Sequence, residues 1–165
     1  MNTVTDTNLS SGVSTFTETH FTIESLLKSQ DGKILVIAAG HDKKVVAKNK
    51  NHGDASQVWV KMPAFLSSVY YYLVNPATNT CVARDSNSQG AHLILTPYTY
   101  GMQDELAMWR EDTSEKFTAI RNHRDQAQKI NIPGNGPYAS GVQLVTWGAK
   151  KVEDNELWTG LTVAP

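Results

Sequence analysis

The chain has 165 residues, of which 40% are hydrophobic and 19% are charged. This length is enough for one domain with a single core and too short for two ordinary domains. The formal net charge is -1 and the Lys and Arg residues are scattered, which argues against nucleic acid as a partner because phosphate backbones require a concentrated positive surface.

The first residues have an unusual composition. Residues 1–19 are rich in Ser, Thr and Asn and lack the basic and apolar regions of a secretory signal. We expect residues 1–18 to be a disordered leader and residues 19–165 to form one domain. No run of about 18 apolar residues is present, so no membrane insertion is expected. With a single cysteine, Cys81, which we expect to be buried in a strand, the chain fits a cytoplasmic protein, or one released without a signal peptide.

After the leader, short runs with strand character are bounded by Gly, Pro, Asn and Asp. In the first stretch, about 19–63, the runs are 21–27, 34–38, 45–47 and 58–60. In the second, about 64–113, they are 69–74, 81–83, 92–95 and 107–110. In the third, about 114–163, they are 116–120, 129–132, 142–147 and 157–163. Because no apolar period of 3.6 residues is sustained, we predict an all-β domain of roughly a dozen strands.

A tryptophan lies near the end of each stretch. Trp59, Trp109 and Trp158 are separated by 50 and 49 residues. They close the triplets Gln57-Val58-Trp59, Ala107-Met108-Trp109 and Glu156-Leu157-Trp158. A unit that recurs at fixed spacing predicts a core built from copies of one module. Because a large buried ring contributes several kcal/mol, we interpret these tryptophans as core residues that specify the fold.

Three four-strand units, each with a Trp on its fourth strand, resemble the β-trefoil. The Gln-x-Trp (QxW) signature resembles that of ricin-B-type (R-type) lectin domains of the fungal fruiting-body kind. The signature is literal in the first copy, has Glu156 in place of Gln in the third, and keeps only Trp109 in the second. The resemblance, over residues 18–163, implies a pseudo-threefold β-trefoil that binds glycans or glycoconjugates, serves in defence and is not an enzyme. It implies no cofactor.

In that family each copy binds sugar through an amide or carboxylate after the second strand, an aromatic ring after the third, and an Asn before the signature Gln. Planar amides and carboxylates pair with vicinal hydroxyls, and an aromatic ring covers the apolar face of a pyranose. The third copy has suitable residues at each place, and the resemblance assigns carbohydrate binding to Asn131, Trp147, Asn155 and Glu156. The alternative for Trp147 is packing against the 133–138 loop, because large rings are partly buried by default.

The other two copies match this template less well. In the second, Tyr98 lies 11 residues before Trp109 and could stack on a sugar, but Ala83 holds the acidic position. In the first we assign the acidic position to Val36 and the aromatic one to Lys48. That copy is degenerate, so we expect Gln57 to bond backbone within its hairpin.

Catalysis and metal binding would each require a recognisable set of residues. No ordered nucleophile and base can be identified, so we predict no catalytic residues. His41, Asp42, His52 and Asp54 flank one hairpin, but their spacing matches no standard ligand set, and we predict no metal site.

The main rival is a β-trefoil protease inhibitor that acts through an exposed loop, 97–102 or 135–138. An interaction module of a toxin or cytokine-like protein is a third hypothesis. A single weak sugar pocket would gain avidity in a homodimer, which we keep as a hypothesis.

Overall fold

Residues 18–163 are described by the computed structural model, and within them the regular structure is thirteen strands and two single-turn 3-10 helices. The first repeat contains β1 His20–Lys28, β2 Ile34–Ala39, β3 Val45–Asn49, η1 Ala55–Gln57 and β4 Trp59–Pro63. The second contains β5 Tyr71–Asn75, β6 Thr80–Arg84, β7 Leu93–Pro97 and β8 Trp109–Glu111. The third contains β9 Ile120–Asn122, β10 Lys129–Asn131, β11 Val142–Gln143, β12 Val145–Trp147, η2 Asp154–Glu156 and β13 Trp158–Thr162. Apart from Glu18, the expected leader lies outside the described residues.

The three signature tryptophans occupy equivalent places. Trp59, Trp109 and Trp158 are each at most 1% exposed, which confirms that they are core residues. Each indole N–H donates a hydrogen bond to a carbonyl oxygen on the second strand of its own repeat. The acceptors are the carbonyl oxygens of Ile37 at 2.8 Å, Val82 at 2.8 Å and Ile130 at 3.0 Å. The recurrence of one contact in three repeats is the pseudo-threefold symmetry of a β-trefoil.

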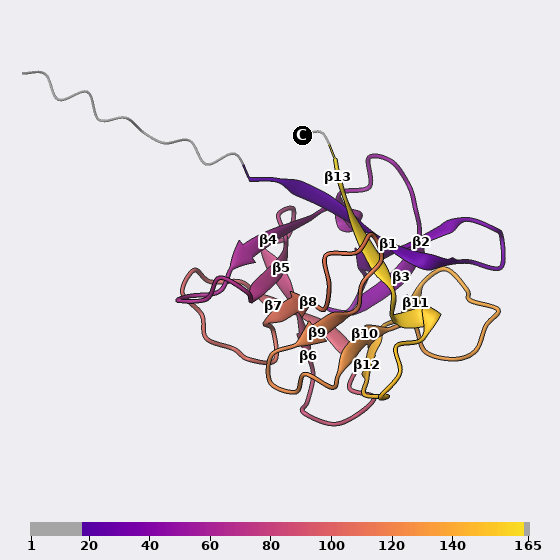
Figure 1. Ribbon diagram of the computed structural model, residues 1–165. Helices are drawn as coiled ribbons and strands as arrows, with labels where there is room; N and C mark the ends of the chain where they lie inside the picture. The colour runs from indigo at the N-terminus through magenta and orange to yellow at the C-terminus, as the bar shows by residue number, and fades with distance from the viewer. Residues whose placement is uncertain (1–17, 164–165) are drawn as a thin grey trace, which may run out of the picture.

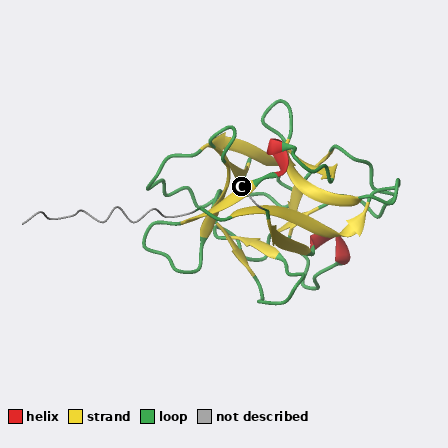
Figure 2. Ribbon diagram, turned by 90° about the horizontal axis from the view of Figure 1, so that it is seen from above, coloured by secondary structure: helices red, strands yellow, loops and turns green. Residues whose placement is uncertain are grey.

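Strand pairing joins the repeats into one sheet. β1 pairs with β2 and β4 of its own repeat and with β13 of the third, in the register Phe21↔Thr162 to Ser25↔Trp158. Figure 1 shows the yellow β13 running alongside the indigo β1. β5 holds the matching place in the second repeat, because it pairs with β4, β6 and β8. Figure 2 shows the two short helices, in red, at separate places among the connecting loops.

The main apolar core draws on all three repeats. Ile23, Leu73 and Ile120 are at most 3% exposed and belong to one cluster with the three signature tryptophans. A smaller cluster under the second repeat contains Tyr72 and Cys81. Among residues 18–163, no helix is long and apolar enough to cross a membrane.

Two predicted strands differ from the structure. The run 142–147 is divided at Leu144, whose N–H donates to the carbonyl of Val45 in the first repeat and whose carbonyl accepts from Leu93 in the second. This residue therefore bonds to both other repeats between β11 and β12. The strand predicted at 116–120 begins instead at Ile120, because the Thr118 hydroxyl accepts the Thr113 N–H at 2.9 Å and closes a turn.

Replacing Trp158 with Ala tests the role of the signature rings. We expect the free energy of unfolding to fall by about 3 to 5 kcal/mol, since the change opens a large cavity and leaves the Ile130 carbonyl without its donor. Urea unfolding followed by circular dichroism measures it. Trp147→Ala is the matched control: that ring is 44% exposed, so its loss should cost less than about 1 kcal/mol. Equal effects in the two variants would contradict the assignment.

Candidate functional site

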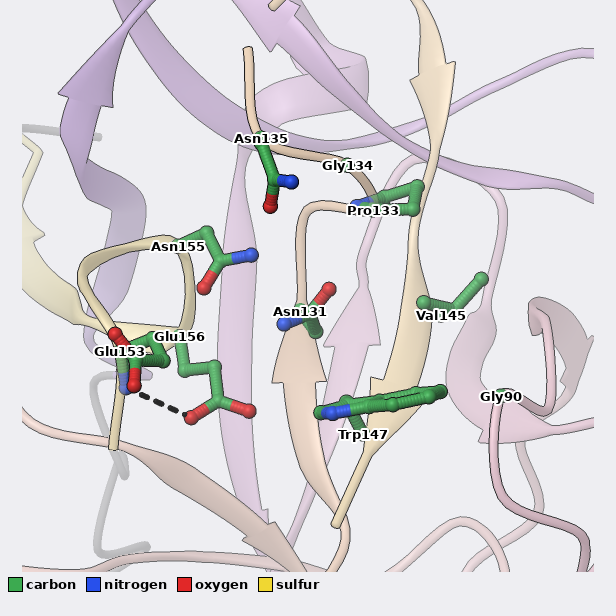
Figure 3. A pocket seen from close by; sticks show the side chains of 10 residues that line it. All are labelled: Gly90, Asn131, Pro133, Gly134, Asn135, Val145, Trp147, Glu153, Asn155 and Glu156. Atoms are coloured by element: carbon green, nitrogen blue, oxygen red, sulfur yellow. Dashed lines mark hydrogen bonds between the residues drawn. The ribbon is translucent and has the colours of Figure 1, made fainter. Parts of the chain in front are cut away.

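A cavity of about 470 Å³ lies beside β10 and β12 in the third repeat, and four of the five residues proposed from the sequence line it. Figure 3 shows the side chains converging on it from two strands, a loop and η2. The lining residues are Gly90, Asn131, Pro133, Gly134, Asn135, Val145, Trp147, Glu153, Asn155 and Glu156. Tyr98 is not among them.

Strand register places the aromatic ring and the first amide on the same side. In the β10–β12 ladder Asn131 pairs with Val145 and Lys129 pairs with Trp147. Because side chains alternate along a strand, Val145 and Trp147 point to one face, where Val145 lies opposite Asn131. Figure 3 shows the Trp147 ring along one side of the cavity, with Asn131 and Glu156 beside it.

The Trp147 ring lies at the surface. Its side chain is 44% exposed, so it is not covered by the 133–138 loop as the alternative interpretation required. Pro133 and Gly134 of that loop instead line the same cavity. On the other side, a Cβ atom added to Gly90 would lie 3.9 Å from Cζ3 of the ring, so this glycine is close to its edge.

η2 supplies the second amide and the carboxylate. The Asn155 Nδ2 donates to the carbonyl of Ile132 at 2.9 Å, which ties η2 to the residue after β10. The Glu156 Oε2 accepts the N–H of Glu153 at 3.1 Å in a capping box. The remaining oxygens, Asn155 Oδ1 and Glu156 Oε1, are buried and have no hydrogen-bond partner in the protein. Two of the residues that line the cavity therefore have a buried acceptor without a hydrogen-bond partner in the protein.

Glu156 is held by a buried lysine. Lys129 and Glu156 are both fully buried, with Nζ 3.3 Å from Oε2. The Lys129 Nζ also donates to the carbonyl of Ala149 at 2.8 Å, which anchors the loop that follows Trp147. Lys129 was predicted only as part of a strand, not as a residue of the site. The sequence feature that could have indicated a buried cation is Glu156, which replaces the Gln of the signature, because a buried carboxylate requires a cation or several donors.

Tyr98 lies elsewhere in the fold. Val82 and Ile130 both accept from a signature Trp, and their cross-strand partners are Leu95 and Thr146. Trp147 directly follows Thr146, and the residue that directly follows Leu95 is Thr96. Thr96 is therefore the counterpart of Trp147 in the second repeat, and Tyr98 lies two residues after it. Its ring centroid is 5.7 Å from that of Tyr72, and it packs against the smaller apolar cluster.

Cys81, in that same cluster, is fully buried, as predicted. Desolvation raises the pKa of its thiol to about 12, so the thiol stays protonated at neutral pH.

The first repeat also contains a hollow, of about 570 Å³, but its chemistry differs. Lys48 forms a 2.9 Å ion pair with Asp54, and hydrogen bonds from Ser56 and Lys48 lower the pKa of that carboxyl group. Asn131 directly follows Ile130, whose carbonyl accepts from Trp158. In the first repeat Trp59 donates to the carbonyl of Ile37, so the residue equivalent to Asn131 is Ala38 and not Val36. The first repeat therefore has an apolar residue where the third has the amide of Asn131.

Gln57 behaves as predicted, bonding the backbone of its own hairpin. Its Nε2 donates to the Asn49 carbonyl at 3.0 Å, and its Oε1 accepts from the Asn51 N–H at 2.9 Å. In residues 18–163, no group of three or more His, Cys, Asp or Glu side chains is placed to hold a metal ion.

Comparison with known proteins supports the same fold. No family model matches the sequence, and no curated protein matches it. The designed threefold-symmetric protein ThreeFoil is 14% identical with a TM-score of 0.68, over 87% of this chain and 99% of that one. The Macrolepiota procera ricin B-like lectin, solved in complex with lactose, is 14% identical with a TM-score of 0.64, over 86% of this chain and 93% of that one.

Part of an enzyme is also similar. An exo-β-1,3-galactanase from Clostridium thermocellum is 18% identical with a TM-score of 0.68, over 88% of this chain, which spans only 30% of the galactanase chain. The chain therefore shares the β-trefoil fold both with a ricin B-like lectin and with one portion of a larger glycosidase.

The Lys129–Glu156 pair can be tested by a double-mutant cycle. Lys129→Met should lower the free energy of unfolding by about 3 to 5 kcal/mol, because it leaves a carboxylate buried without its cation. Adding Glu156→Gln removes that charge, so the double variant should be more stable than the sum of the single effects predicts. Chemical denaturation of the four proteins measures the coupling. Additivity within about 0.5 kcal/mol would show that the two groups do not interact.

Proposed function

We propose that the chain is a carbohydrate-binding lectin and that a saccharide occupies the cavity of the third repeat. The observation that carries the proposal is the half-exposed Trp147 ring beside Asn131, Asn155 and Glu156 in one open cavity. A pyranose has an apolar C–H face and a rim of hydroxyl groups. The first fits an exposed indole, and the second fits amide and carboxylate groups at its edge.

The fold neighbour solved with lactose supports this class of ligand, and the proposal includes no catalytic step. The signature resemblance further supports a role in defence, and the proposal places the chain in the cytoplasm or, after release by a non-classical route, outside the cell. A single shallow site exchanges solvent hydrogen bonds for protein ones with little net gain, so one site should bind in the millimolar to high micromolar range. Useful avidity would then come from a second copy of the chain.

One observation favours the rival function. Tyr100, in the loop after β7, is 84% exposed, as an inhibitor loop that enters a protease cleft would require. In the other loop named from the sequence, Tyr138 is partly buried, packs against the main core and donates its hydroxyl to the Gly134 carbonyl at 3.1 Å. Burial also raises its phenolic pKa. The 97–102 loop is therefore the stronger of the two inhibitor candidates, and assays with papain and trypsin test it.

Replacing Trp147 with Ala should abolish glycan binding while the protein stays folded, since the ring is half-exposed and contributes the stacking surface. A broad glycan array run with purified protein measures binding, and circular dichroism checks the fold. Tyr100→Ala is the matched control, because it removes an exposed aromatic ring outside the cavity and should leave binding unchanged. Unchanged binding in the Trp147 variant would refute this site.

A further inference from the structure

We infer that the third-repeat cavity selects sugars that carry a protonated amino group over neutral sugars, and excludes acidic sugars. This inference rests on the proposed function and names the ligand class of the same site. Its starting point is the pair of buried oxygens, Asn155 Oδ1 and Glu156 Oε1, that have no partner in the protein. Both belong to residues that line the cavity, and both accept hydrogen bonds without donating any.

The orientation of Glu156 directs its unpaired oxygen to the ligand. Figure 3 shows one carboxylate oxygen bonded back to Glu153, while the other points across the cavity toward the Trp147 ring. The residue itself is fully buried, so the position of this oxygen is set by the fold. A ligand group that reaches it must be a donor, because a buried acceptor left without one costs about 1 to 3 kcal/mol.

The charges around the cavity have one sign. Its lining contains two carboxylates, Glu153 and Glu156, and includes no Lys or Arg. Lys129 is not among the lining residues, and its Nζ contacts the other carboxylate oxygen of Glu156 and donates to the Ala149 carbonyl. Lys151 lines the adjoining hollow together with Glu153, outside the cavity. Lys129 already balances the charge of Glu156, so the carboxylate of Glu153 is the one that attracts a cationic ligand and repels an anionic one.

An ammonium group suits this arrangement better than a hydroxyl. It has three donors and a positive charge, so it can bond the free carboxylate oxygen and a neighbouring acceptor together, and charge-assisted bonds are roughly twice as strong as neutral ones. An amino sugar would thus stack its ring on Trp147 and place its ammonium at Glu156.

Titration calorimetry with four methyl glycosides tests the inference: galactosamine, galactose, N-acetylgalactosamine and galacturonic acid, with the gluco series in parallel. In at least one series the amine should bind about tenfold more tightly than its neutral counterparts at low salt, and the acid should not bind. The preference should shrink as salt rises, because the charges at the rim are screened.

Matched variants locate the charge that is responsible. Glu156→Gln should remove most of the preference for the amine, and Glu153→Gln should reduce it severalfold without disturbing the contact with Lys129. Asp154→Asn is the control, since this neighbouring carboxylate is exposed and does not line the cavity. If Glu156→Gln fails to fold, Glu153→Gln alone still decides the matter. An unchanged preference in every variant that folds would overturn the inference.

The two proposals fail in distinguishable ways. If neutral sugars bind as tightly as amines in both series, the cavity is a lectin site without this selectivity, and the inference is wrong while the proposed function stands. If neither the glycosides nor a broad glycan array gives binding, the proposed function is wrong and the inference falls with it.

Discussion

The hydrogen bond from each signature indole to the second strand of its repeat is the contact on which the rest of the structure depends. It satisfies the one polar group of a large ring, which can then be buried completely in the core. It also joins the fourth strand to the second within a repeat. The third strand lies between these two strands in the sequence, so the bond fixes where the segment that contains it begins and where it ends.

The residue two places before each signature Trp makes different contacts in the three repeats. Gln57, Ala107 and Glu156 are all buried at this position. Gln57 bonds the backbone of its own hairpin, and Ala107 joins the smaller apolar cluster. Glu156 instead pairs with Lys129 and keeps one oxygen free. The third repeat therefore differs from the other two in this side chain and in its charged partner.

The sequence predicted the fold well because its signals are local. Short apolar runs bounded by turn residues located most strands, and the spacing of Trp59, Trp109 and Trp158 indicated the triplication. Loop length explains what counting missed. The loop after the third strand is two residues longer in the second repeat, so a count of 11 from Trp109 reached Tyr98 instead of Thr96. In the first repeat the hairpin between β2 and β3 is shorter, and the count gave Val36 instead of Ala38.

Four of the cavity residues could be predicted from the sequence, because the third repeat has a suitable residue type at every place of the family template. Lys129 lay beyond that reasoning for a different reason. A lysine at the start of a strand ordinarily points to solvent, and nothing in the strand pattern distinguishes one that turns inward. What reveals it is the partner, Glu156, which lies 27 residues away in the sequence. Such pairs become visible only when the strands are placed in register.

A buried ion pair is poor evidence for stability, because an amide or an apolar residue in the same place is often as good or better. This chain contains that alternative, since Gln57 closes the equivalent hairpin with neutral hydrogen bonds. In the third repeat the burial of Lys129 and Glu156 costs the free energy of removing two charges from water. Glu156 Oε1 nevertheless has no partner in the protein. It is also the repeat that holds Trp147, the one tryptophan of the four that is not buried. Other buried polar atoms of the fold also lack partners, but Asn155 Oδ1 and Glu156 Oε1 belong to residues that line the cavity beside the exposed Trp147 ring, and this combination is what the proposed ligand site rests on.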